Sequence, residues 1–122
     1  MATILDRIVE TKRLEVARSK IEMPISSLEE RIRAHELPLN LSGALMGDGA
    51  RLIAEAKKAS PSRGLLRDNY DPAALASSYA DNGAAAVSVL TEMDNFQGSL
   101  EHMEAVKEVL QPLGVPVLRK DF

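Results

Sequence analysis

Apolar residues in the second half of the chain alternate between strand-like runs and helix-like stripes. Apolar runs bounded by turn residues predict three buried strands: Leu52–Ala56, Ala84–Leu90 and Val115–Phe122. Between these runs, apolar residues recur at helical spacing over residues 72–81 and 99–110. The order strand, helix, strand, helix, strand repeats after roughly thirty residues, which is typical of βαβ units with right-handed crossovers. The pattern therefore predicts an α/β fold with a parallel sheet covered by helices.

The first fifty residues carry helical patterns only. Thr3 can cap a charged helix that runs to about Lys20. Ser26 and Ser27 are each followed three residues later by a glutamate, so both are capping-box candidates for a second helix over about residues 28–36. A short helical turn over residues 40–46 leads into the first strand. We therefore divide the chain into a helical extension, residues 1–50, and a strand-and-helix segment, residues 51–122.

Each predicted strand has a polar or charged residue near its carboxyl end. Glu55 and Lys57 are two residues apart and therefore share one face of the first strand. Ser88 and Lys120 take similar places in the second and third strands. Because the carboxyl ends of parallel strands are where α/β folds bind ligands, these residues predict a site. The alternative is a salt-bridged strand end, with Lys120 reaching solvent.

Composition narrows the class of protein. The chain has 122 residues, a net charge of -3, no cysteine and 3% aromatic residues. This balance favours neither nucleic acid nor an anionic membrane as a partner, and it excludes disulfides and thiolate zinc sites. No apolar stretch is long enough to span a bilayer, and residues 1–7 lack the core of a signal peptide. We expect a cytoplasmic protein.

The third predicted strand ends at Phe122 with no covering helix after it. Parallel sheets are usually covered on both faces, and a complete eight-stranded barrel needs roughly 250 residues. We therefore expect that the sequence is one part of a larger fold.

Four blocks of the sequence, in this order, resemble the indole-3-glycerol phosphate synthase family: Leu52–Gly64, Ser88–Glu92, Phe96–Ser99 and Pro116–Phe122. Residues 4–9 and 11–13 resemble the N-terminal helix of that family. The resemblance implies a TIM (β/α)8 barrel with an N-terminal helical extension. This chain would carry the extension, the first three barrel strands and the two helices between them.

The resemblance also implies an activity and a set of site residues. The family converts 1-(2-carboxyphenylamino)-1-deoxyribulose 5-phosphate to indole-3-glycerol phosphate in tryptophan biosynthesis. This carboxy-lyase reaction releases carbon dioxide and water and uses no metal or organic cofactor. Lys120 matches the general acid, Glu55 an acid/base glutamate, and Lys57 a lysine that binds anionic groups of the substrate and serves dehydration. Further residues match substrate-binding positions: Ser60, Pro61, Phe96, Leu118 and Phe122.

Two hypotheses follow from the parts of the family pattern that this chain lacks. A later catalytic glutamate and the phosphate-binding loops after the last strands are absent, so we expect the 122 residues alone to be inactive. The first hypothesis is therefore a partial synthase site for a small phosphorylated substrate. The second is a half-barrel that associates with itself or with a complementary C-terminal half. Phosphoribosylanthranilate isomerase, another barrel enzyme, lacks two of the blocks, and ordinary core packing is an alternative role for Phe96 and Phe122.

Overall fold

The computed structural model describes all residues from Met1 to Phe122. Residue contacts divide them into two compact units, one of Met1–Pro38 with Phe122 and one of Leu39–Asp121. The functional division at residue 50 stays a prediction.

The N-terminal unit contains the helices α1 (Ile4–Glu22) and α2 (Ile25–Ala34). Thr3 caps α1 as predicted: its hydroxyl oxygen accepts from the Asp6 N–H at 3.2 Å, and its own N–H donates to the Asp6 carboxylate at 2.7 Å. This reciprocal pair of hydrogen bonds is a capping box, which satisfies backbone N–H groups that have no partner within the helix.

The predicted capping box of the second helix is wrong. α2 begins three residues earlier than expected, with Pro24 at the N-cap and no side-chain cap. The Pro24 carbonyl already accepts from the N–H groups of Ser27 and Leu28, at 3.0 and 3.2 Å. The serines Ser26 and Ser27 therefore lie inside the first turn, where their hydroxyls cannot take the N-cap position.

The second unit begins with a short helix, α3 (Leu41–Leu45), which matches the predicted turn. The Asn40 side chain caps it by accepting from the Gly43 N–H at 2.9 Å. Gly47 then adopts a φ of 114°, a left-handed conformation that glycine takes without a steric penalty. This turn sends the chain into the first strand.

The second unit is an α/β structure with a parallel three-stranded sheet, as the pattern predicted. Its strands are β1 (Ile53–Ala56), β4 (Ala86–Leu90) and β5 (Val117–Lys120), in the order β1-β4-β5. Both strand pairs are parallel. Pro116 directly precedes β5, where its carbonyl accepts from the Val87 N–H at 3.1 Å and its missing N–H breaks no strand pairing.

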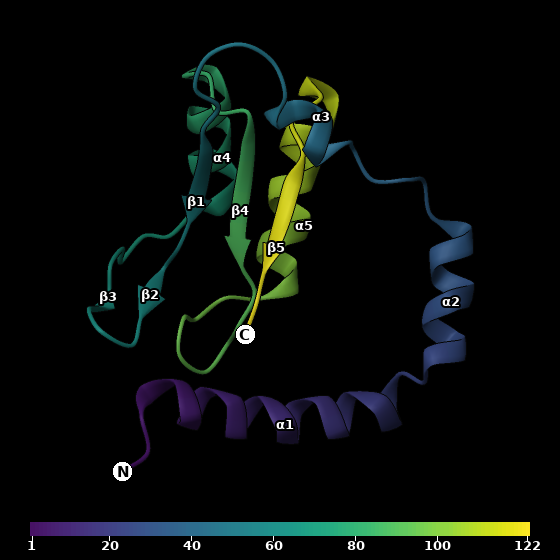
Figure 1. The fold of residues 1–122 in the computed structure, drawn as a ribbon, viewed down its shortest axis with the longest axis vertical. Helices are drawn as coiled ribbons and strands as arrows, with labels where there is room; N and C mark the ends of the chain where they lie inside the picture. Colours follow the sequence, from purple (N-terminus) through teal and green to yellow (C-terminus); the bar gives the residue numbers. More distant parts are fainter. The chain divides into compact units, whose positions relative to one another are not determined.

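Two capped helices cover one face of this sheet. α4 (Pro72–Asp81) and α5 (Leu100–Leu110) begin at Asp71 and Ser99, whose side chains accept from backbone N–H groups at 3.0 and 3.1 Å. Figure 1 shows both helices on the same side of β1, β4 and β5. The buried core lies between these helices and the sheet and contains Ala56, Ala76, Val87, Val89, Val106 and Leu110. A 3-10 turn, η1 (Gln111–Leu113), and Gly114 connect α5 to β5.

A small hairpin follows β1. β2 (Ala59–Ser60) pairs antiparallel with β3 (Gly64–Leu65). Strands of two residues are too short to show an alternating pattern, so periodicity does not reveal them. The Lys58 carbonyl accepts from the Leu66 N–H at 2.8 Å and closes the base of the hairpin.

Candidate active site

The strand register places the predicted acid and amine on one face of the sheet. Glu55 of β1 lies opposite Ser88 of β4, and Ser88 lies opposite Leu118 of β5. Two residues further along, Leu90 lies opposite Lys120. Laterally paired residues point to the same face, and residues two apart in a strand do so as well. Glu55, Ser88, Leu118 and Lys120 therefore share the face that α4 and α5 do not cover.

Glu55 and Lys57 form an ion pair at the carboxyl end of β1. The Lys57 Nζ lies 2.9 Å from the Glu55 Oε1, and both side chains are about one-third exposed. The Tyr79 hydroxyl of α4 donates to the Glu55 backbone carbonyl at 3.1 Å. This hydrogen bond connects α4 to the backbone of β1 at Glu55. The Glu55 side chain points to the opposite face of the sheet, which carries the candidate site.

Ser60 organises the loop after β1. Its side chain is buried, and its hydroxyl oxygen accepts from the Arg63 N–H at 3.3 Å and lies 3.4 Å from the Ser62 hydroxyl. Pro61 is exposed at the turn of the hairpin. The structure therefore gives Ser60 a role in the shape of the loop, while substrate binding by Ser60 and Pro61 stays a prediction.

Thr91 links the carboxyl ends of β4 and β5. Its N–H donates to the Lys120 carbonyl at 2.9 Å, and its hydroxyl lies 2.7 Å from the Asp121 carboxylate. Arg119 donates from Nε to the Thr91 hydroxyl oxygen at 3.1 Å and pairs with Asp121 at 3.4 Å. This network fixes the backbone on both sides of Lys120. Sequence reasoning did not single out Thr91.

Glu92 is a second residue that sequence reasoning did not assign a role. Its side chain is 2% exposed, although it carries a carboxylate. The carboxylate accepts from the backbone N–H groups of Asp94, Asn95 and Phe96. The available signal was a glutamate two residues after a buried strand, followed by a short polar segment whose N–H groups need an acceptor. Phe96, one of the predicted substrate-binding residues, is buried in this loop at 8% exposure.

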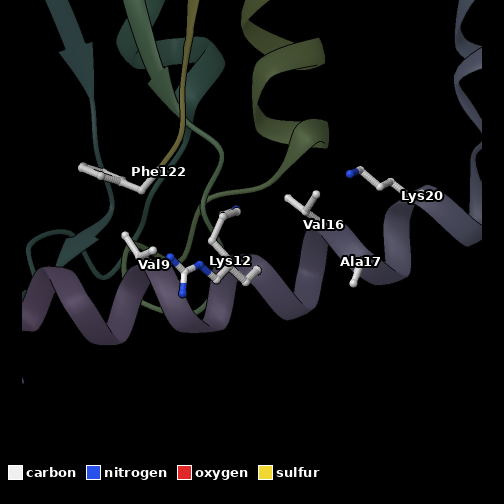
Figure 2. A pocket seen from close by; sticks show the side chains of 7 residues that line it. Val9, Lys12, Val16, Ala17, Lys20 and Phe122 are labelled. Atoms are coloured by element: carbon white, nitrogen blue, oxygen red, sulfur yellow. The ribbon is translucent and has the colours of Figure 1, made fainter.

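The remaining predicted residues, Leu118 and Phe122, are partly exposed. Phe122 belongs to the N-terminal unit, where it lines an apolar hollow with residues of α1 (Figure 2): Val9, Lys12, Arg13, Val16, Ala17 and Lys20. Contact of Leu118 or Phe122 with a substrate ring stays a prediction.

Two groups with shifted pKa values lie on the helix side of the sheet. The rings of Tyr70 and His102 meet edge to face, with centroids 5.2 Å apart. Burial, reinforced by Tyr79, raises the pKa of Tyr70 to about 12. Burial, reinforced by the nearby charge of Lys58, lowers the pKa of His102. The charge of Glu55 also contributes to the raised pKa of Tyr70. We assign neither group a catalytic role.

The chain holds no group of three His, Cys, Asp or Glu residues that could bind a metal ion. None of its helices is both long enough and apolar enough to cross a membrane.

Comparison with known proteins places these features in a family. The family model described as indole-3-glycerol phosphate synthase matches residues 5–122. Proteins with that name from Roseiflexus sp. (strain RS-1) and Chlorobium chlorochromatii (strain CaD3) are 48% and 50% identical to this chain. The match covers 100% and 98% of this chain but 47% of each relative.

A third relative, from Mycolicibacterium smegmatis, carries the same name and is 46% identical over 99% of this chain and 43% of its own length. The chain thus spans about half the length of the curated relatives it matches. The chain belongs to the indole-3-glycerol phosphate synthase family.

Proposed function

We propose that residues 1–122 form the N-terminal part of a synthase that makes indole-3-glycerol phosphate in tryptophan biosynthesis. In this proposal β1, β4 and β5, with α4 and α5 between them, are the first three strands and two helices of a TIM (β/α)8 barrel. The helices α1 to α3 are the extension before it, and the protein acts in the cytoplasm. The observation that carries the proposal is the shared face of Glu55 and Lys120 in a chain of this family.

The proposed reaction closes an indole ring on 1-(2-carboxyphenylamino)-1-deoxyribulose 5-phosphate. An aromatic carbon bonds to the carbonyl carbon of the sugar, and the carbonyl oxygen takes a proton. Carbon dioxide then leaves from the ring carbon that has formed the new bond, and the new hydroxyl leaves as water. Ring closure, decarboxylation and dehydration are all steps that acid/base groups can assist, so we expect full activity in the presence of a metal chelator.

We assign Lys120 as the proton donor to the carbonyl oxygen, because an ammonium can deliver a proton that a guanidinium would retain. Lys57 binds anionic groups of the substrate and assists dehydration. Glu55 holds Lys57 at 2.9 Å and stabilises cationic intermediates on the same face. The polar residues of this site therefore come from β1 and β5, with β4 between them.

Five residues would line the substrate pocket: Ser60, Pro61, Phe96, Leu118 and Phe122. The aromatic rings would pack on the ring of the substrate, and Leu118 would lie behind them. For Phe96, whose side chain is 8% exposed, packing in the protein core is the competing role.

The experiment supplies the substrate to two samples. The first is residues 1–122 alone, for which we expect no turnover because the phosphate-binding loops of the family are not within it. The second joins residues 1–122 to the remainder of the barrel, and here we expect indole-3-glycerol phosphate as the product. If the second sample is folded and forms no product, the proposed function is wrong.

A second candidate function is association through the sheet edges. β1 and β5 each pair with β4 alone, so each leaves one edge without a strand partner. Such edges pair readily with another strand. We propose that residues 1–122 bind either a second copy or a separate C-terminal half-barrel. Size measurement in solution tests this, and a monomer that stays unchanged when the second half is added would contradict it.

A further inference from the structure

Resting on the proposed function, we infer that Glu92 is a positioning residue that folds the loop after β4 and thereby holds Phe96 against the substrate. The proposed chemistry gives Glu92 no part in the reaction. Its polar side chain is buried, which is unfavourable unless hydrogen bonds compensate for lost water. The loop supplies that compensation.

The carboxylate of Glu92 is saturated by donors from its own loop. Oε2 accepts from the backbone N–H groups of Asn95 at 2.8 Å and Phe96 at 3.1 Å. Oε1 accepts from the Asp94 N–H at 3.2 Å and from Nδ2 of Asn95 at 3.1 Å. A carboxylate has about four lone-pair sites, so these four donors use its full capacity. Glutamine has a neutral side chain of similar size, but only its oxygen accepts hydrogen bonds, whereas its NH2 group donates them.

The backbone closes the loop around this carboxylate. The Glu92 carbonyl accepts from the Gly98 N–H at 2.8 Å, and the Met93 carbonyl accepts from the Gln97 N–H at 3.0 Å. Gln97 adopts a φ of 51°, a left-handed conformation that is unusual for a residue other than glycine. The loop is therefore held in a strained shape by hydrogen bonds to the carboxylate and carbonyl of Glu92 and by the hydrogen bond between Gln97 and Met93.

Phe96 is the residue through which Glu92 would affect binding. The Phe96 N–H is one of the four donors, so the carboxylate fixes the backbone from which the ring projects. The loop leaves β4 directly after Leu90 and Thr91, at the carboxyl end of the strand where the proposed site lies. Without the Glu92 carboxylate, the loop would no longer hold the Phe96 ring in place, while Glu55, Lys57 and Lys120 would be unchanged.

The test compares Glu92→Gln with the matched control Glu108→Gln in a protein that joins residues 1–122 to the remainder of the barrel. Glutamine keeps the size of the side chain but turns one acceptor end into a donor, which then faces backbone N–H groups. We expect hydrogen exchange at the amides of Asn95 and Phe96 to accelerate at least tenfold. We expect the KM for the substrate to rise about tenfold, because the contact between the Phe96 ring and the substrate would be lost. The change in kcat should be smaller. Glu108 is exposed on α5, so its variant should change neither quantity.

A double-mutant cycle with Phe96→Leu separates positioning from general stability. If Glu92 acts through Phe96, Glu92→Gln adds less than twofold to the KM of Phe96→Leu. Should Glu92→Gln not fold, Asn95→Ala removes one of the four donors and is expected to shift exchange and KM in the same direction by less.

The possible failures are distinguishable. A wild-type protein without synthase activity refutes the proposed function and the substrate part of this inference. Unchanged exchange at Asn95 and Phe96 in Glu92→Gln refutes the loop part. Accelerated exchange with an unchanged KM, or additive effects with Phe96→Leu, refutes the positioning role.

Discussion

Glu55 and Lys120 lie on the same face of the sheet although β4 separates the strands that carry them. The register brings this about in two steps, from Glu55 to Ser88 and, two residues along β4, from Leu90 to Lys120. The apolar core occupies the other face, between the sheet and the helices. Stability and the proposed chemistry thus depend on opposite faces of the same strands, which lets substitutions separate them.

Replacement of Lys120 by arginine tests the role of proton donor. Arginine keeps the positive charge but retains its proton under all ordinary conditions. In a protein that joins this chain to the remainder of the barrel, we expect kcat for indole-3-glycerol phosphate formation to fall about 100-fold or more, the usual effect of losing a general acid. Steady-state kinetics measures this. Lys107→Arg, on the exposed side of α5, is the control and should keep the kcat of the wild type. A Lys120→Arg variant with wild-type kcat would exclude this role.

Replacement of Glu55 by glutamine distinguishes a catalytic pair from a structural one. Glu55 and Lys57 are 2.9 Å apart but about one-third exposed, and ion pairs this accessible contribute less than about 1 kcal/mol to stability. We expect the free energy of unfolding to change by no more than about 1 kcal/mol, while kcat falls at least tenfold. Denaturant unfolding and steady-state kinetics provide the two values. A large loss of stability with unchanged kcat would favour the salt-bridged strand end.

Sequence patterns predicted the parts of this fold in which local signals agree with the topology. The helical spacing of apolar residues over residues 72–81 predicted α4, and the apolar run at residues 84–90 predicted β4. The pattern failed at Ser26 and Ser27, because a capping box requires the serine at the N-cap and Pro24 takes that place. A capping motif identifies the residues that could cap a helix, but the backbone decides which residue does.

Part of the candidate site could likewise be predicted from the sequence, and part could not. Strand alternation alone predicted that Glu55 and Lys57 share a face, and the strand pattern placed Lys120 at the carboxyl end of a further strand. The family resemblance added the role of Lys120 as general acid. The role of Glu92 in its loop could not be predicted, because its partners are backbone N–H groups whose positions depend on the loop itself. Hydrogen bonds from a side chain to an irregular backbone leave no periodic signal in a sequence.

The helix caps allow a direct stability test. Asp71→Ala removes a carboxylate that accepts from the Ala74 N–H at 3.0 Å, so we expect a loss of about 1 kcal/mol in the free energy of unfolding. Ser27→Ala should change it by less than about 0.5 kcal/mol, because Ser27 is not the cap of α2 and Ala is the better helix former. Denaturant unfolding of both variants measures the difference. Equal losses would mean that Ser27 caps α2 in solution.

Gly98 is expected to tolerate no side chain. A Cβ atom there would lie 2.2 Å from the Leu90 carbonyl oxygen, 2.6 Å from its carbon and 2.9 Å from the Thr91 nitrogen, all of them backbone atoms. We expect Gly98→Ala to reduce the free energy of unfolding by about 3 kcal/mol or more, since β4 or the loop must shift. Gly83→Ala is the comparison: its Cβ would meet nothing within 4 Å, and only its φ of 92° opposes alanine. Its cost should be about 1 kcal/mol. Equal costs would indicate that the loop moves freely.

His102 should make stability depend on pH. Burial and the nearby Lys58 lower its pKa from 6.5 in the folded state, and only Glu101 opposes them. The unfolded chain therefore binds a proton more readily, so the contribution of His102 is present above pH 6.5 and is lost as the pH falls below it. We expect the free energy of unfolding to decrease below pH 6.5 more steeply in the wild type than in His102→Gln. His35→Gln, exposed after α2, should keep the steeper slope. Parallel slopes for the wild type and His102→Gln would show that the imidazole is equally accessible to protons in both states.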